Sequence, residues 1–142
     1  MDSLYNKYFL ICLLQFVLKL TQNESCSLLG AVQREDVHRL KRLLEDRHVY
    51  GHDDLGRALR AASHKGEEEC AQVLIDAGAL PNVHDASGFS PVIIAAKFGH
   101  PNIIRLLVKA NCNINKANFR ARATALHWAA TNGHQECVEV KI

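Results

Sequence analysis

The stretch Ser90-Pro-Val-Ile-Ile-Ala-Ala-Lys-Phe-Gly99 decides the fold, because the chain carries the same pattern twice more. Small and apolar residues leading to a glycine recur in Arg57-Ala-Leu-Arg-Ala-Ala-Ser-His-Lys-Gly66 and in Thr124-Ala-Leu-His-Trp-Ala-Ala-Thr-Asn-Gly133. The three glycines are 33 and 34 residues apart. A fixed period of this length predicts a solenoid of stacked units, each of which buries its apolar side only against a neighbour.

The residues around Gly99 predict a pair of antiparallel helices. Ser90 followed by Pro91 is typical of a helix start, with a capping residue and then a proline that needs no N–H partner. Ala95 and Ala96 are small enough for neighbouring helices to approach closely, and Gly99 permits the reversal into a second helix. That second helix has an apolar stripe at helical spacing, formed by Ile103, Ile104, Leu106 and Leu107.

These residues resemble the ankyrin repeat, whose pattern reads roughly D-x-x-G-x-T-P-L-H-x-A-A-x-x-G-H before an apolar helix and G-A-x-x-N. One unit matches at Asp85, Gly88, Ser90, Pro91, Ala95, Ala96, Gly99, His100, Leu106, Leu107 and Asn115, and the next matches at Thr124, Leu126, His127, Ala129, Ala130, Gly133, His134, Glu136 and Val138. The resemblance covers about residues 25–142, as repeats at 25–52, 53–84, 85–116 and 117–142, and the last is cut short. It implies an all-α solenoid of stacked antiparallel helix pairs with connecting β-hairpin loops.

Several positions depart from the pattern. Glu35 stands where the turn glycine of the first repeat is expected, and a leading hairpin over residues 50–56 is out of register by about one residue. The segment 116–123 has one extra residue and lacks the usual aspartate and glycine. Gly78 and Asn111, one period apart, suit the left-handed residue that ends a helix. The fourth repeat stops part-way through its second helix, so we expect marginal stability.

Residues 1–24 lie outside the repeat pattern and contain an apolar stretch at 8–20. This stretch is shorter than the roughly 20 residues that a spanning helix needs. A helix that caps the first repeat is the favoured interpretation. A membrane anchor or a partner helix is the second, and a signal peptide is the third. Cleavage of a signal peptide would leave unpaired thiols in an oxidising compartment, which counts against it.

Composition narrows the range of functions. The formal net charge is +2, from 17 basic and 15 acidic residues, and gives no strong attraction to nucleic acid. The five cysteines are irregularly spaced and form no CxxC pair, which favours a reducing, intracellular location. We therefore expect a cytoplasmic or nuclear protein, or one found in both.

No arrangement of reactive residues indicates catalysis. A metal site built from His127, His134 and Cys137 would need ligands from two helices to converge. A nucleophile pair of Cys137 and His134 lacks an oxyanion hole and an orienting third group. The resemblance to the ankyrin repeat implies that His127 hydrogen-bonds to neighbouring backbone and stiffens the turn into its helix. We predict no enzyme activity, no cofactor, no metal and no small-molecule substrate.

Binding of a partner protein is the predicted function. Ankyrin-repeat proteins usually bind their partners through the hairpin tips and through a concave face formed by the inner helices. Aromatic residues and arginines concentrate binding energy, and the candidate partner-binding residues are Tyr50, Phe89, Ile94, Phe98, Phe119, Arg120, Arg122 and Trp128. Trp128 and Phe98 could equally well only pack between units. Asn82 and Asn115, each eight residues after a leucine, are candidate hydroxylation sites, because the resemblance implies such a modification. The alternatives are a membrane-tethered scaffold anchored by residues 8–20 and a truncated form without function.

Overall fold

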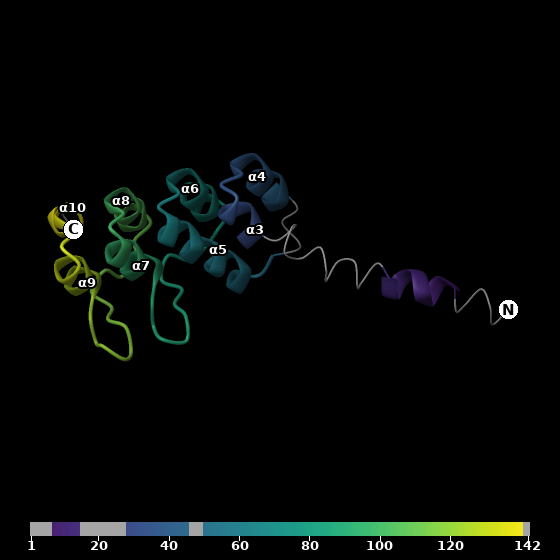
Figure 1. Ribbon diagram of the computed structural model, residues 1–142. Coiled ribbons are helices and arrows are strands. Elements are labelled where there is room, and N and C mark those ends of the chain that lie inside the picture. The colour runs from purple at the N-terminus through teal and green to yellow at the C-terminus, as the bar shows by residue number, and fades with distance from the viewer. Residues whose placement is uncertain (1–6, 15–27, 46–49, 141–142) are drawn as a thin grey trace.

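Four helix pairs stack side by side in a computed structural model that describes residues 7–14, 28–45 and 50–140. The pairs are α3 (Leu28–Gln33) with α4 (Val37–Glu45), α5 (His52–Lys65) with α6 (Glu68–Asp76), α7 (Pro91–Phe98) with α8 (Pro101–Lys109), and α9 (Ala125–Thr131) with α10 (Gln135–Glu139). The inner helices α3, α5, α7 and α9 pack in one row and the outer helices α4, α6, α8 and α10 in another (Figure 1). The all-α solenoid predicted from the 33-residue period is confirmed.

The core runs continuously through the stack because each pair contributes to its junction with the next. Ala58, Ala62, Ala95 and Ala96 are fully buried, so the inner helices pack closely at the positions where the sequence has small residues. Larger side chains fill the space between the inner and outer rows, among them Leu40, Leu59, Leu74, Ile93, Ile103 and Leu107. The apolar stripe predicted for α8 is buried at three of its four positions and half-buried at Leu106.

Left-handed residues make the reversal between the two helices of each pair. Gly66 and Gly99 both have φ of +79°, and Gly133 has φ of +71°. Glu35 occupies the equivalent position in the first pair with φ of +58°, as its place in the sequence predicted. Because a side chain in this region costs roughly 1–2 kcal/mol, the first turn is strained where the others are not.

A hydrogen bond joins the end of each of the inner helices α3, α5 and α7 to the following pair. His100 Nε2 donates to the carbonyl oxygen of His64 at 2.9 Å, and His134 Nε2 donates to that of Lys97 at 3.0 Å. At the first junction Lys65 Nζ donates to the carbonyl oxygen of Gln33 instead. These three carbonyl groups sit two residues before the turn residue, where a helix lacks partners of its own. Each pair therefore completes the pair before it.

The loops between α6 and α7 and between α8 and α9 project beyond the inner helices (Figure 1), and side chains as well as backbone groups close them. Asp85 Oδ1 accepts from the N–H groups of Ser87 and Phe89, and Asn118 Oδ1 accepts from Ala123 N–H. Asn118 thus takes the part of the missing aspartate and is only 2% exposed. The described residues contain no strand, so the loops are hairpin-like turns without a β ladder.

Two left-handed residues explain how the chain manages without glycine. Asn111 ends α8 with φ of +62°, as predicted, and Gly78 has φ of +99° at the equivalent place. Arg122 has φ of +50° in the turn that has one residue more than the Gly88 turn. The departure in segment 116–123 is therefore absorbed by Asn118 and Arg122 together.

One local prediction was wrong, and another was confirmed only in part. The hairpin predicted over residues 50–56 is helical from His52, because Gly51 starts the helix and Asp53 and Asp54 lie in its first turn, where carboxylates are favourable. Ser90 occupies the predicted capping position, but its hydroxyl makes no capping bond and has no partner among the described residues.

Residues 7–14 form a short helix (Figure 1), and its side chains are all exposed. The apolar side chains at 8–11, 13 and 14 are 47–68% exposed. A cap would have to bury them against the first repeat, so the capping role stays a prediction without a packing contact to support it. Within the described part of the chain no helix is long and apolar enough to cross a membrane. Residues 15–20 of the predicted anchor lie outside that part.

Candidate partner-binding face

Lys97 lies at the centre of an aromatic cluster on the inner-helix face. Its Nζ is 5.2 Å from the centroid of Phe89, 5.5 Å from that of Phe98 and 5.0 Å from that of Trp128. The Phe89 and Trp128 rings are 5.6 Å apart and tilted by 48°. Contacts of this length between an ammonium and ring faces are attractive. We call Lys97, Phe89, Phe98 and Trp128 the aromatic cluster.

The helical period places this cluster on a surface shared by three pairs. Ala61, Ile94 and Trp128 each stand five residues before a turn glycine, and all three are half-buried. The His64 ring of α5 meets the Phe98 ring of α7 edge-on, with centroids 4.1 Å apart. The inner-helix face is therefore continuous from α5 to α9. Phe98 is 43% exposed and is the most open ring of the aromatic cluster.

Trp128 makes no use of its one polar atom. Its Nε1 is buried and has no hydrogen-bond partner among the described residues. Leaving a buried donor unpaired costs about 1–3 kcal/mol. Phenylalanine would supply a ring to the cluster without that cost. Packing between units alone therefore leaves the indole N–H of Trp128 without a partner within the described part of the chain.

The tips of the two long loops contact each other. Phe119 N–H donates to the carbonyl oxygen of Ser87 at 3.0 Å, and the Phe119 ring meets the His84 ring edge-on with centroids 5.1 Å apart. The ring lies against Gly88, where a Cβ would come within 2.9 Å of it. Phe119 is nevertheless 55% exposed. The loop tips thus form a braced edge with an aromatic side chain at its surface.

The structure places all but one of the predicted partner-binding residues in two groups. Phe89, Phe98 and Trp128 are in the aromatic cluster, with Ile94 on the same face of α7. Phe119, Arg120 and Arg122 are exposed at the tip of the loop before α9. Tyr50 is half-buried against the core before α5 and belongs to neither group. Sequence reasoning missed Lys97, although it lies between Ile94 and Phe98, which were both candidates.

The two candidate hydroxylation sites differ in their contacts. Asn82 Oδ1 accepts from the N–H of Asn113 at 2.6 Å and so links one loop to the next. The backbone N–H of Asn115 donates to Asn113 Oδ1 at 3.3 Å, and the Asn115 side chain takes no part in this bond. Both asparagines are exposed. Modification at either remains a prediction.

His127 braces the start of α9, as the sequence predicted. Its Nδ1 accepts from Thr124 N–H at 3.1 Å, and the Thr124 hydroxyl lies 2.8 Å from the same atom. The ring therefore serves the helix end. Among the described residues no group of three or more His, Cys, Asp or Glu side chains is arranged to hold a metal ion.

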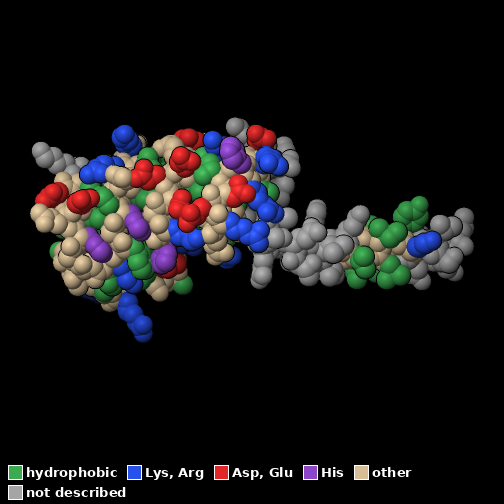
Figure 2. Space-filling model, turned by 45° about the horizontal axis from the view of Figure 1, so that its top comes forward, with side chains coloured by type: hydrophobic (Ala, Val, Ile, Leu, Met, Phe, Trp, Pro, Cys, Tyr) green, Lys and Arg blue, Asp and Glu red, His purple; other side chains and the backbone are tan. Residues whose placement is uncertain are grey.

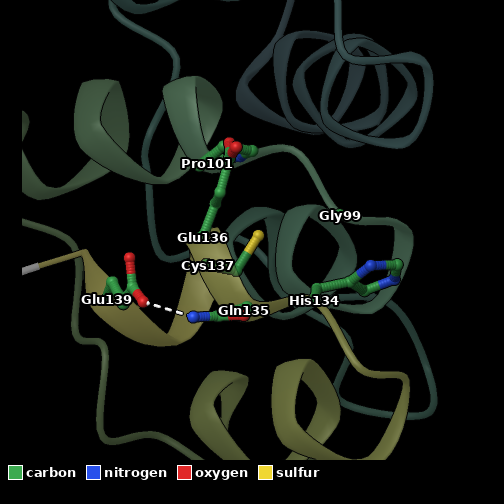
Figure 3. A pocket seen from close by; sticks show the side chains of 7 residues that line it. All are labelled: Gly99, Pro101, His134, Gln135, Glu136, Cys137 and Glu139. Carbon is green, nitrogen blue, oxygen red and sulfur yellow. Dashed lines mark hydrogen bonds between the residues drawn. The ribbon is translucent and has the colours of Figure 1, made fainter.

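A hollow of about 520 Å³ lies on the outer side between α8 and α10, and Figure 3 shows its lining. It contains Cys137 and His134, the pair considered above as a nucleophile and its base. Figure 3 shows the His134 ring pointing away from the Cys137 sulfur. The Nε2 atom of that ring is hydrogen-bonded to the backbone carbonyl oxygen of Lys97. Burial raises the pKa of the Cys137 thiol, and the Glu136 carboxylate raises it further while Arg105 lowers it. A thiol held protonated is a poor nucleophile.

The outer face differs from the aromatic cluster in its charge. Acidic and basic side chains are interspersed over the outer helices (Figure 2). Such mixing is typical of a solvated surface. It gives the outer face no single sign of charge and no aromatic anchor.

Stacked helix pairs with a continuous aromatic and basic face define a solenoid interaction module. A sequence model described as "Ankyrin repeats (3 copies)" matches residues 28–118 and, in an overlapping match, 59–140. The chain belongs to the ankyrin-repeat family. Domains of this kind are non-catalytic modules for protein–protein interaction.

Relatives with the same repeats are larger and diverse. The chain is 34% identical over 86 residues to the E3 ubiquitin-protein ligase XBAT33 of Arabidopsis thaliana. The matched region covers 61% of this chain and 17% of that protein. It is 36% identical over 92 residues to ankyrin repeat domain-containing protein 63 of Homo sapiens, and this match covers 61% of the chain and 24% of that protein. It is 31% identical over 84 residues to the tyrosine-protein kinase HTK16 of Hydra vulgaris, and this match covers 58% of the chain and 11% of that protein. The chain thus spans less than a quarter of the length of these relatives.

Proposed function

We propose that this chain is an adaptor that binds a partner protein through the aromatic cluster and the adjoining loop tips. The observation that carries the proposal is the set of three rings from α7, α9 and the loop before α7 gathered around Lys97. Aromatic side chains grouped at the centre of a surface are the usual anchors of protein interfaces. Phe119 at the braced loop tip extends the same surface. Catalysis by this chain forms no part of the proposal.

Affinity capture with single substitutions tests this function. Phe89→Ala and Phe119→Ala should each deplete the proteins that the wild-type chain captures from a cell extract. Lys109→Ala, on the outer helix α8, should leave the captured set unchanged. Far-UV circular dichroism of each variant guards against unfolding. The same captured proteins with all three variants would refute a role for the inner face.

We also propose a cytoplasmic or nuclear location. The cysteines at 12, 70, 112 and 137 are free thiols, and burial raises the pKa of the thiols at 70, 112 and 137. Such thiols suit a reducing compartment. Fractionation of cells that express the full chain checks this proposal, and recovery from the secreted medium would contradict it.

Attachment to a membrane is a second candidate function, favoured by the exposed apolar side chains of the helix over residues 7–14. Sedimentation with phosphatidylcholine–phosphatidylserine vesicles separates the two ideas. The full chain should pellet with vesicles if the segment is an anchor, and a variant that lacks residues 1–24 should not. Equal amounts in the supernatant would remove the anchor. A form without function, the third alternative, would instead show a shallow and non-cooperative thermal melt.

A further inference from the structure

We infer that the partner of the aromatic cluster is an extended peptide segment in which a carboxylate lies next to apolar side chains. This inference rests on the proposed binding function and specifies its partner. It draws on three observations: the sign of the charge around the cluster, the contacts of Lys97, and the way in which the rings are covered.

The stretch from residue 86 to residue 135, which makes up most of the third and fourth repeats, is basic wherever it is charged. Between residues 86 and 135 the sequence has no aspartate or glutamate. The same stretch has six basic residues, Lys97, Arg105, Lys109, Lys116, Arg120 and Arg122. Arg105 and Lys109 belong to the outer helix α8, which leaves the other four on α7 and on the loop before α9. The binding surface thus attracts acidic segments although the whole chain is nearly neutral.

Lys97 keeps its charge available. Within the described part of the chain, the contacts of its ammonium group are with the three rings, and none is with a carboxylate. Rings around an ammonium hold it in position without neutralising it. A carboxylate that reached Nζ would form a charge-assisted hydrogen bond beside apolar ring surface. The residues next to that carboxylate would then pack on Phe98, the most exposed ring of the cluster.

A basic surface with aromatic residues also suits single-stranded nucleic acid, but here the rings are poorly placed for it. Binding of that kind needs open ring faces on which bases stack. Phe89 and Trp128 are half-buried and packed together, and Lys97 lies over all three rings of the cluster. The observations therefore favour a carboxylate-bearing peptide.

Selection from a library of random 12-residue peptides tests the inference with the full chain. Enrichment of Asp or Glu next to apolar residues is the expected result. Enriched peptides without Asp or Glu would overturn this inference and leave the proposed function standing. The absence of any enriched peptide would overturn both. Tight binding of a dT12 oligonucleotide that competes with the selected peptides would also overturn the inference, in favour of nucleic acid.

Trp128 reports binding directly because it is the one tryptophan of the chain. Titration with a selected peptide should change its emission. Lys97→Met should weaken binding at least tenfold and flatten its dependence on salt, and Lys97→Arg should preserve most of the affinity. Lys109→Met makes the same change in net charge away from the cluster and should have little effect. Equal losses for Lys97→Met and Lys109→Met would reduce the effect to net charge and overturn the inference.

A charge exchange gives the strictest test. Lys97→Glu should abolish binding of the selected peptide, and replacing the peptide carboxylate by lysine should restore binding to this variant alone. Circular dichroism should show the same helical signal for each variant. Loss without restoration, in a variant that stays folded, would show that the peptide carboxylate does not contact Lys97.

Discussion

Replacing Gly99 with alanine should destabilise the stack by more than backbone strain alone. Gly99 has φ of +79°, which costs an alanine roughly 1–2 kcal/mol. In addition, a Cβ there would lie 2.7 Å from Nδ1 and 2.8 Å from Cε1 of the His134 ring. The ring would have to move and lose its bond to the Lys97 carbonyl, at about 0.5–1.5 kcal/mol. The expected total is about 1.5–3.5 kcal/mol.

Gly133→Ala is the matched control. Its φ is +71°, so the backbone strain is similar, but nothing lies within 4 Å of the added Cβ. It should cost only the roughly 1–2 kcal/mol of strain. Urea unfolding followed by far-UV circular dichroism measures both. In a His134→Ala background, the destabilisation caused by Gly99→Ala should fall to the cost of backbone strain alone, because the ring that the new Cβ would displace is gone.

The double substitution decides between this explanation and a general weakness of the turn. A cost of Gly99→Ala that is the same with and without the His134 ring would refute the argument that contact between repeats sets the magnitude. The same result would mean that the bond to Lys97 contributes nothing measurable to stability. Non-additivity of about 1 kcal/mol is well within what double-mutant cycles resolve.

Three further outcomes are expected. Glu35→Gly should raise the free energy of unfolding by up to about 1–2 kcal/mol, because Glu35 holds a left-handed φ of +58°; an unchanged urea midpoint would contradict this. Burial raises the pKa of Glu67, and the charge of Glu35 and a hydrogen bond with it raise that pKa further. The folded state therefore favours protonated Glu67, and the stability it contributes is present at acid pH and lost as pH rises through the folded pKa. Glu67→Gln should consequently stabilise the protein more at pH 7 than at pH 4, and a pH-independent gain in melting temperature would exclude this cause. Co-expression with an asparaginyl hydroxylase should add 16 Da, the mass of one oxygen, to peptides that contain Asn82 or Asn115, and unmodified masses would remove that prediction.

The repeat itself was readable from the sequence because each of its signals is local. The glycines at 66, 99 and 133 mark left-handed turns, and the small residues before them mark close helix packing. Asn111 was correctly placed as a left-handed helix end. The turns and helix ends depend on backbone geometry within one unit, and the small residues recur at the same offset in each unit, so one sequence is enough to interpret them.

Features that join two units were not readable. The replacement of the loop aspartate by Asn118, with Arg122 in the left-handed position, depends on how an extra residue is accommodated in three dimensions. The start of α5 was misplaced because the expected hairpin competed with good helix-starting residues at 51–54. Lys97 was overlooked because its significance comes from rings on two other segments. A pattern within one unit does not show which side chains meet across units.

The hydrogen bonds between successive pairs give the array a chemical direction. Each junction pairs a carbonyl acceptor on one unit with a side-chain donor on the unit after it. The third unit contains both a donor and an acceptor of this kind. His100 donates to the carbonyl of His64 in the second unit, and the carbonyl of Lys97 accepts from His134 in the fourth. A gene duplication that copied this unit in tandem would therefore supply its own matching surfaces. Arrays of this kind can lengthen in evolution without a new interface having to arise first.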